Sequence, residues 1–283
     1  MTIFTTAPDF VGHRGTIQRN AIQSWKLLDP NRILLIGPSL GAEEIAAEMS
    51  LEYIPDVPCA PTGPPLADSF FGAADERGGD LMLYVASDVI LTRDLTQAIA
   101  QIPFERYLLT GRRRNLDVRT ELDFTPGWEQ SMVRAARSRG HRAHPAAVDY
   151  LLFTHGIWRD IPPFAMGRRA WDNYMVYRAM EAGLPVIDAS RVVCAVHQNH
   201  DRSFLPEIQW TRYGPEDLMN LELLPTAGHA ADSRDAGWIL TRDGVRKARG
   251  AGLRRRARSL LRSKAPAATR VLRRIANRVT GYE

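Results

Sequence analysis

Three segments of the sequence carry side chains that could bind a cation or move a proton. Asp88 closely follows the most apolar run of the chain, residues 81–85. Asp172 opens a segment with helical spacing, and His197 follows the apolar run 192–196. Carboxylate and imidazole groups bind divalent cations and act as general acids or bases. The sequence therefore predicts metal or acid–base chemistry if the fold brings these segments together.

Each of these residues also has a purely structural interpretation. An aspartate after a strand commonly stabilises a turn, and an aspartate at the start of a helix commonly caps it. A single histidine often does no more than donate or accept a hydrogen bond. The functional interpretation therefore depends on the three segments in combination.

The elements that would position these side chains alternate along the first 100 residues. Short apolar runs with the length of strands occur at residues 2–6, 32–36, 51–54 and 81–85. Between them, apolar residues recur at helical spacing in segments 17–28, 42–49 and 66–74. This alternation predicts an α/β fold with a Rossmann-like, mostly parallel central sheet flanked by helices. Further strands are expected at 107–110, 150–153, 185–187 and 192–196, with a helix at 171–182.

In combination, the three segments resemble the GT-A class of nucleotide-sugar glycosyltransferases, particularly small bacterial enzymes related to the inverting family 2. In that class the fourth strand ends in an Asp-x-Asp motif that binds a divalent ion on the diphosphate. Here Ala86, Ser87 and Asp88 stand at the three positions. Segment 171–178, followed by 182–188, is similar to the family-2 segment in which a Glu-Asp pair opens a helix.

The resemblance covers about residues 2–210 and implies a metal-assisted, inverting glycosyltransferase that uses a nucleoside diphosphate sugar. It implies that Asp172 is the catalytic base and that Asp88 and His197 bind Mn²⁺ or Mg²⁺. The acceptor is expected to be a glycan or a lipid-linked molecule. The residues that the resemblance places at the substrate and nucleotide are Thr5, Thr6, Arg19, Asp68, Ser87, Asp88, Trp171 and Asn173.

Two departures from the family pattern leave alternatives open. Ala86 replaces the first aspartate of the motif, and Trp171 replaces the glutamate of the Glu-Asp pair. His197 and cationic groups such as those of residues 112–114 could compensate for the missing carboxylate. A sugar-nucleotide nucleotidyltransferase, with segment 11–15 as its phosphate loop, is one alternative. A non-catalytic sugar-nucleotide or glycan-binding module of the same fold is the other.

The net charge of the 283-residue chain, +5, conceals a strong asymmetry. Residues 242–283 contain 14 Lys and Arg but only two acidic residues, so this segment has a net charge of +12 and residues 1–241 have −7. Apolar residues in the segment recur at helical spacing. Such a basic amphipathic segment predicts binding to an anionic membrane surface, whereas a solvated tail is the alternative. Because Tyr282 is its only aromatic residue, nucleic acid is not the expected partner.

These patterns predict a catalytic domain at residues 1–215, a linker at 216–241 and the basic tail at 242–283. Cys59 and Cys194 have no metal-binding spacing and are expected to be free thiols. The first residues lack a basic and apolar leader pattern, and no apolar run has the length of a membrane span. We therefore expect a cytoplasmic protein that is peripheral on the inner face of the membrane.

Overall fold

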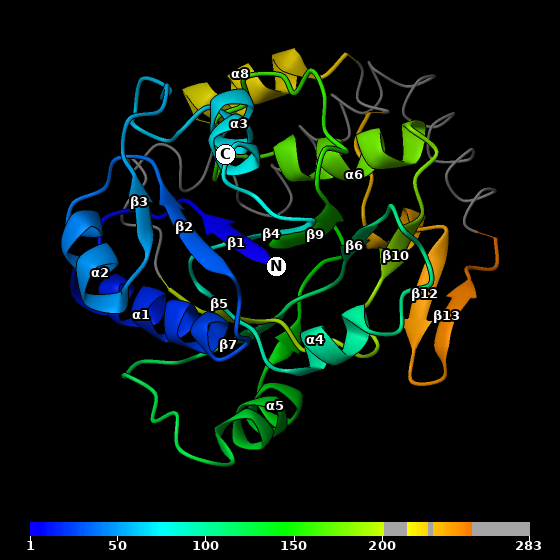
Figure 1. Ribbon diagram of the computed structural model, residues 1–283, viewed down its shortest axis with the longest axis horizontal. Helices are drawn as coiled ribbons and strands as arrows, with labels where there is room; N and C mark the ends of the chain where they lie inside the picture. The colour runs from blue at the N-terminus through cyan, green and yellow to red at the C-terminus, as the bar shows by residue number, and fades with distance from the viewer. Residues whose placement is uncertain (201–213, 226–228, 251–283) are drawn as a thin grey trace, which may run out of the picture.

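The computed structural model describes residues 1–200, 214–225 and 229–250. A nine-stranded sheet crosses the molecule, and a second sheet of four strands lies beside it (Figure 1). The strands of the large sheet, in spatial order, are β13 (Gly244–Lys247), β12 (Trp238–Thr241), β10 (Val186–Asp188), β6 (Leu108–Thr110), β9 (Tyr150–Thr154), β4 (Leu81–Val85), β1 (Thr2–Thr5), β2 (Arg32–Ile36) and β3 (Glu52–Ile54). Those of the small sheet are β5 (Val89–Ile90), β11 (Val196–Gln198), β7 (Arg114–Leu116) and β8 (His141–Arg142).

Most neighbouring strands of the large sheet are parallel. Strand β1 pairs in parallel with both β2 and β4, and β10 pairs in parallel with both β6 and β12. Strand β9 runs antiparallel between β4 and β6, and β13 runs antiparallel to β12 at the edge. The carboxyl ends of β1, β4, β6 and β10 therefore meet at the same edge, where ligands of open α/β sheets usually bind.

Helices cover both faces of the large sheet (Figure 1). Side chains alternate along the strands, so Ile3 and Leu83 pack with one helical layer while Phe4 and Tyr84 pack with the other. The first layer includes α1 (Gly12–Lys26), α2 (Ala42–Met49) and α4 (Asp94–Ile99), and the second includes α3 (Ala67–Asp75) and α6 (Trp171–Glu181) with α8 (Pro215–Leu223) above them. Helix α5 (Trp128–Ser138) packs on the small sheet.

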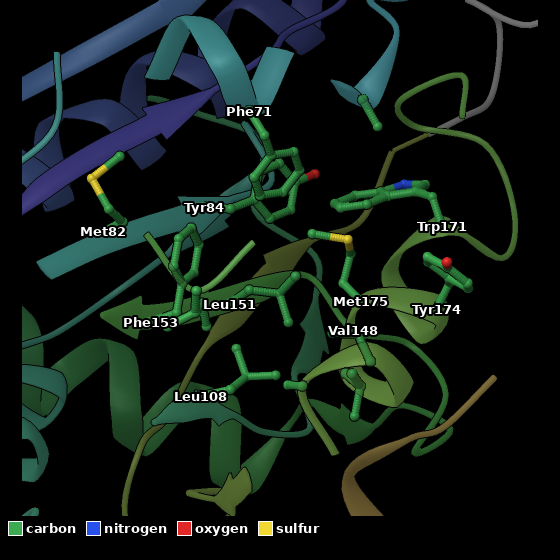
Figure 2. Packing of buried hydrophobic residues seen from close by; sticks show 14 of the residues in the cluster. Phe71, Met82, Tyr84, Leu108, Val148, Leu151, Phe153, Trp171, Tyr174 and Met175 are labelled. Atoms are coloured by element: carbon green, nitrogen blue, oxygen red, sulfur yellow. The ribbon is translucent and has the colours of Figure 1, made fainter. Parts of the chain in front are cut away.

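An aromatic cluster joins the second helical layer to the sheet (Figure 2). The ring of Phe71 lies 6.3 Å from that of Tyr84 and 6.0 Å from that of Trp171, measured between centroids. Tyr84 and Trp171 meet edge to face at 4.9 Å. Such contacts stabilise a buried cluster beyond the area that they remove from water. The cluster therefore fixes the start of α6 against the end of β4.

The predicted α/β class and the mostly parallel sheet are confirmed, and the strands expected at 32–36 and 81–85 have those bounds. Two expectations differ from the structure. The last expected strand is displaced, because Val192 and Val193 turn back to hydrogen-bond Ala189 and the strand begins only at Val196. Residues 216–241, expected to be a linker, instead supply most of α8 and all of β12, because Trp238 and Ile239 pair with β10 and extend the sheet.

The expected basic tail begins inside the fold and then leaves the described residues. Strand β13 carries Arg246 and Lys247 and pairs with β12, whereas residues 251–283, which hold the amphipathic pattern, lie outside the described residues. Within the described residues, no helix is long and apolar enough to cross a membrane.

Candidate functional site

A cavity of about 390 Å³ opens at the edge where β1 and β4 end. Thr6, Ser87 and Asp88 line it from the sheet, and Arg14 lines it from α1. The loops at residues 62–65 and 166–168 form other parts of its wall. Its position after the carboxyl ends of parallel strands is that of a ligand site in an open α/β sheet.

Helix α8 holds both of these loops in place. The Glu216 carboxylate accepts hydrogen bonds from the Thr62 N–H at 3.0 Å and from the Arg168 guanidinium at 3.1 Å. Asn220 accepts from the Ala165 N–H at 2.8 Å and donates to the Arg169 carbonyl oxygen at 3.0 Å. The side chain of Arg168 is only 8% exposed although it lines the cavity. The segment that the sequence suggested was a linker therefore fixes part of the cavity wall.

Asp88 and two histidines form a cluster, of which Asp88 and His200 line this cavity and His197 lies behind them against Asp88. The Asp88 Oδ1 lies 3.2 Å from His197 Nδ1, and its Oδ2 lies 2.9 Å from His200 Nε2. One ligand atom from each of the three residues falls within 4.8 Å of the others. Ligands that meet at right angles on bonds of about 2.1 Å are separated by about 3 Å. The cluster therefore has nearly the spacing of three ligands on one cation.

The pairing of the small sheet brings these residues together. His197 on β11 stands opposite Val89 on β5, so it is placed beside Asp88 across a gap of 109 residues. The next residue, Gln198, donates to the Asp88 carbonyl oxygen and accepts from Asn20 Nδ2 at 3.0 Å. Gln198 is fully buried. This buried amide connects the segments of Asp88 and His197 to α1, and the sequence pattern of the separate segments does not reveal this connection.

The charge of Asp88 is set by its two neighbours. Burial opposes ionisation of this carboxyl, but the imidazoles of His197 and His200 outweigh burial and hold the pKa well below its usual range. An ionised carboxylate beside two imidazoles is a suitable ligand set for a divalent transition metal.

Asp172 lies at the start of α6 and differs from Asp88. Its side chain is half-buried and accepts a hydrogen bond from the Asn173 N–H at 2.8 Å. Burial raises the pKa of Asp172 to about 7; the Asn173 N–H opposes this shift, and the charge of Asp149 adds to it. A carboxyl group that titrates near neutral pH is suited to accept a proton from a substrate.

Tyr84 connects the two acidic positions, and Asp149 lies between them. Burial raises the pKa of the Tyr84 phenol well above its usual value, and the charges of Asp149, Asp172 and Asp88 raise it further. All three carboxylates therefore act on one side chain. Asp149 precedes β9, is ion-paired with Arg113, and lies 3.8 Å from His197 Nδ1. No sequence motif points to Asp149, because a single aspartate before a strand is common in α/β proteins.

The structure brings some of the predicted nucleotide-binding residues to the cavity. Thr6, Ser87 and Asp88 line it. Thr5 is buried, and its hydroxyl donates to the Thr6 carbonyl oxygen. Trp171 is buried in the aromatic cluster.

Three other positions lie elsewhere. Asn173 Nδ2 donates to the carbonyl oxygens of Ala146 and Ala231 and so holds two loops at the start of α6. Arg19 pairs with Glu48 at 2.5 Å. Asp68 lines a separate cavity on the α3 side of the sheet.

Two residues that were not among the predicted site residues line the cavity. His200 joins Asp88 and His197, and the His-x-x-His spacing was a signal for it in the sequence. Arg14 lies in the first turn of α1 and is 9% exposed. Arg14 and Asp88 line the same cavity because β1 and β4 are neighbours in the sheet, and the sequence does not specify this strand order.

No model of a known protein family and no curated protein sequence matches this chain. Several solved structures are similar. Glucosyl-3-phosphoglycerate synthase from Mycobacterium tuberculosis, in complex with Mn²⁺, UDP and phosphoglyceric acid, has 12% identity and a TM-score of 0.45, with 71% of each chain covered. A mannosyltransferase from Pyrobaculum calidifontis, in complex with GDP-mannose and Mn²⁺, has 12% identity and a TM-score of 0.46, with 72% of this chain and 58% of that chain covered. A mycobacterial protein has 16% identity and a TM-score of 0.48 over 87% of this chain and 82% of that chain.

Proposed function

We propose that this protein is a metal-dependent glycosyltransferase that moves a sugar from a nucleoside diphosphate sugar to an acceptor hydroxyl with inversion. The observation that carries the proposal is the cluster of Asp88, His197 and His200 at the cavity where β1 and β4 end. The segments that resemble the family motifs, residues 86–88 and 171–188, contain Asp88 and Asp172, to which the proposal gives roles.

The residues of the cluster fit a bound cation. One carboxylate and two imidazoles leave positions open for phosphate oxygens, and imidazole favours Mn²⁺ over Mg²⁺. When bound, the ion would offset the charge that develops on the departing diphosphate. His200 supplies the third ligand that Ala86 cannot, because alanine has no donor atom.

Two guanidinium groups with little solvent exposure line the cavity as donors for the diphosphate. Arg14 and Arg168 line it from different elements, and each is at most 9% exposed. A guanidinium presents two parallel N–H donors to phosphate oxygens. The ion pair with Glu216 orients Arg168 before the donor binds.

Asp172 would act as the base. Its carboxylate takes the proton of the acceptor hydroxyl while the acceptor oxygen attacks the anomeric carbon. The bond between that carbon and the diphosphate oxygen breaks, and the nucleoside diphosphate leaves with the electron pair. Because attack and departure take place on opposite faces of the sugar, the configuration inverts.

A nucleotide-release assay over a panel of sugar nucleotides tests this function. UDP-glucose and GDP-mannose are the first donors to test, each with Mn²⁺ and with a chelator. We expect Asp88→Asn and Asp172→Asn each to lower turnover by about 10²-fold or more. Asp56→Asn, at an exposed loop position, is the matched control and should retain full activity. If both site variants turn over normally, the assigned roles are wrong.

Ala86 favours a second candidate, a sugar-nucleotide-binding protein without turnover. Calorimetric titration with UDP in the presence and absence of Mn²⁺ separates the two. The enzyme should bind UDP more tightly with the metal and release nucleotide from a donor. Binding that is independent of Mn²⁺, with no release, would favour the second candidate.

The basic segment motivates a membrane-surface location. Each basic residue near an anionic surface contributes about 1 kcal/mol, so the charge of +12 suffices for reversible binding. Since β13 ends at Lys247, truncation should follow Gly250 rather than residue 241. We expect this truncation to abolish sedimentation with anionic liposomes. If the full chain does not sediment either, the membrane location is wrong.

A further inference from the structure

A group of arginines lies beside the proposed site without matching carboxylates. Arg112 donates from Nε and Nη2 to the carbonyl oxygen of Ala143, at 3.0 and 2.6 Å. Arg142 donates from Nη2 to the carbonyl oxygen of Ser190. Arg114 stands opposite Arg142 in the pairing of β7 with β8. Carbonyl oxygens orient a guanidinium but leave its charge unneutralised.

The acidic groups nearby do not balance this charge. Asp232 accepts two hydrogen bonds from Arg234, so these two residues neutralise each other. Asp188 accepts from the Ser190 N–H at 2.9 Å and keeps its charge, so this one carboxylate offsets only part of the charge of the three arginines. Among the described residues, no salt bridge involves Arg112, Arg114 or Arg142.

Like charges repel one another, and the pKa of Arg112 reflects this repulsion. Burial lowers the pKa of the Arg112 guanidinium, the charge of Arg142 lowers it further, and Asp188 only partly offsets the two. Directly opposed like charges destabilise a strand pair. An anion bound between the guanidinium groups would remove this cost.

The arginine group lies on the same edge of the sheet as the metal-binding cluster. Arg112 comes two residues after β6, and Asp88 comes three residues after β4, with only β9 between these two strands. Strands are about 4.8 Å apart, so the ends of β4 and β6 are about 10 Å apart across the sheet.

The loop that follows β8 links the arginines to the proposed base. Arg112 holds this loop at Ala143, and Asn173 holds it at Ala146 through a hydrogen bond of 3.2 Å. The N–H of Val148, at the end of the loop, is close enough to the Asp172 carboxyl to lower its pKa. Five residues span at most about 17 Å, which limits how far Val148, beside Asp172, can lie from Ala143, which Arg112 contacts.

We propose that Arg112 and Arg142 bind a phosphate group on the acceptor, so that the acceptor is an anionic phosphomonoester whose hydroxyl lies at Asp172. This inference rests on the proposed function and names its acceptor class. Guanidinium groups match the oxygens of phosphate in geometry and charge. The phosphate could belong to a small soluble molecule or to a lipid headgroup, and both present the same group to the arginines.

Binding of inorganic phosphate tests the arginines directly. Calorimetric titration without metal and nucleotide should detect binding to the full chain and to Asp88→Asn, which lacks the proposed metal site. Arg142→Gln and Arg112→Gln should each raise the dissociation constant about tenfold. Arg246→Gln, an exposed arginine on β13 that pairs with Asp243, is the matched control and should bind like the unmodified chain. Arg142 is exposed, so its variant is expected to fold even if Arg112→Gln unfolds at a lower temperature.

Transfer assays then identify the source of the phosphate. Glycerol 3-phosphate is compared with glycerol as an acceptor, and vesicles with phosphatidate are compared with phosphatidylcholine vesicles as competitors of phosphate binding. Preference for either phosphorylated probe that is lost in Arg142→Gln supports the proposal and names the source. Equal phosphate binding by Arg112→Gln, Arg142→Gln and Arg246→Gln overturns it. Titration with UDP and Mn²⁺ reports on the donor site separately, so failure of the proposed function is recognised independently.

Discussion

Two aspartates at the same edge of the sheet have opposite electrostatic environments. Asp88 follows β4 and contacts two imidazoles, which hold its pKa well below the usual range although the half-buried position of the carboxyl opposes its ionisation. Asp172 opens α6, and burial together with the charge of Asp149 raises its pKa to about 7. When two carboxyl groups are shifted apart in this way, one is suited to remain a charged ligand and the other to exchange protons. This difference is the reason why we propose metal binding for Asp88 and base catalysis for Asp172.

The largest expected effect separates the two residues by metal affinity. Asp88→Asn removes the only carboxylate of the three-residue cluster and should weaken Mn²⁺ binding by about 10²-fold or more, because an amide oxygen is an uncharged ligand. Asp172→Asn should bind Mn²⁺ as the unmodified chain does. Calorimetry or electron paramagnetic resonance of Mn²⁺ measures both. Equal losses in the two variants would show that the aspartates share one role.

The pH dependence of turnover tests the proposed role of Asp172 as the base. A base must be unprotonated to accept a proton, so kcat should rise with pH and level off above the pKa of Asp172, about 7. Asp172→Asn should lower kcat by about 10²- to 10⁴-fold and remove this limb. Steady-state rates between pH 5 and 9 with saturating donor provide the measurement. A limb that persists in Asp172→Asn would assign it to another group.

Both aspartates could be predicted as site residues from the sequence, but the opposite shifts of their pKa values could not. Apolar runs and helical spacing are local, so the strand at 81–85 and the start of the helix at 171 could be read from them directly. The shift of Asp88 depends on the pairing of β5 with β11, which joins segments about 100 residues apart. The shift of Asp172 comes mainly from burial and in part from Asp149, which precedes β9, the strand that inserts antiparallel between β4 and β6. Register and strand order are properties of the whole sheet, and spacing along the chain does not encode them.

Residues 216–241 illustrate the same limit. Their short, mixed segments lack a clear period, and we expected a linker. Helix α8 nevertheless forms there because Glu216 and Asn220 find partners on the loops around the cavity. Such polar contacts leave no hydrophobic pattern in the sequence.

A smaller effect is expected when the charge that acts on Asp172 from Asp149 is removed. Asp149→Asn removes a negative charge that raises the pKa of Asp172, so the rising limb of the rate profile should move to lower pH by roughly half a unit to one unit. The same rate measurements detect it. Asp56→Asn, which removes a distant exposed charge, should leave the limb in place. A shift to higher pH would contradict the direction of the Asp149 effect.

The smallest expected effect is on stability. Since the folded state raises the pKa of Asp172 from 3.8 to about 7, it binds a proton more tightly than the unfolded state. The resulting contribution to stability is fully present below about pH 4 and is lost as pH rises through about 7. Asp172→Asn removes the ionisation, so its free energy of unfolding should exceed that of the unmodified chain by roughly 1–3 kcal/mol at pH 8 and by less than about half of that at pH 5. Urea unfolding at both values measures this, and a stability difference that does not change with pH would mean that Asp172 is not protonated by burial. A variant that is more stable at pH 8 yet nearly inactive would identify Asp172 as a residue whose unfavourable environment serves function, unlike Asp88, whose charge its histidine neighbours stabilise.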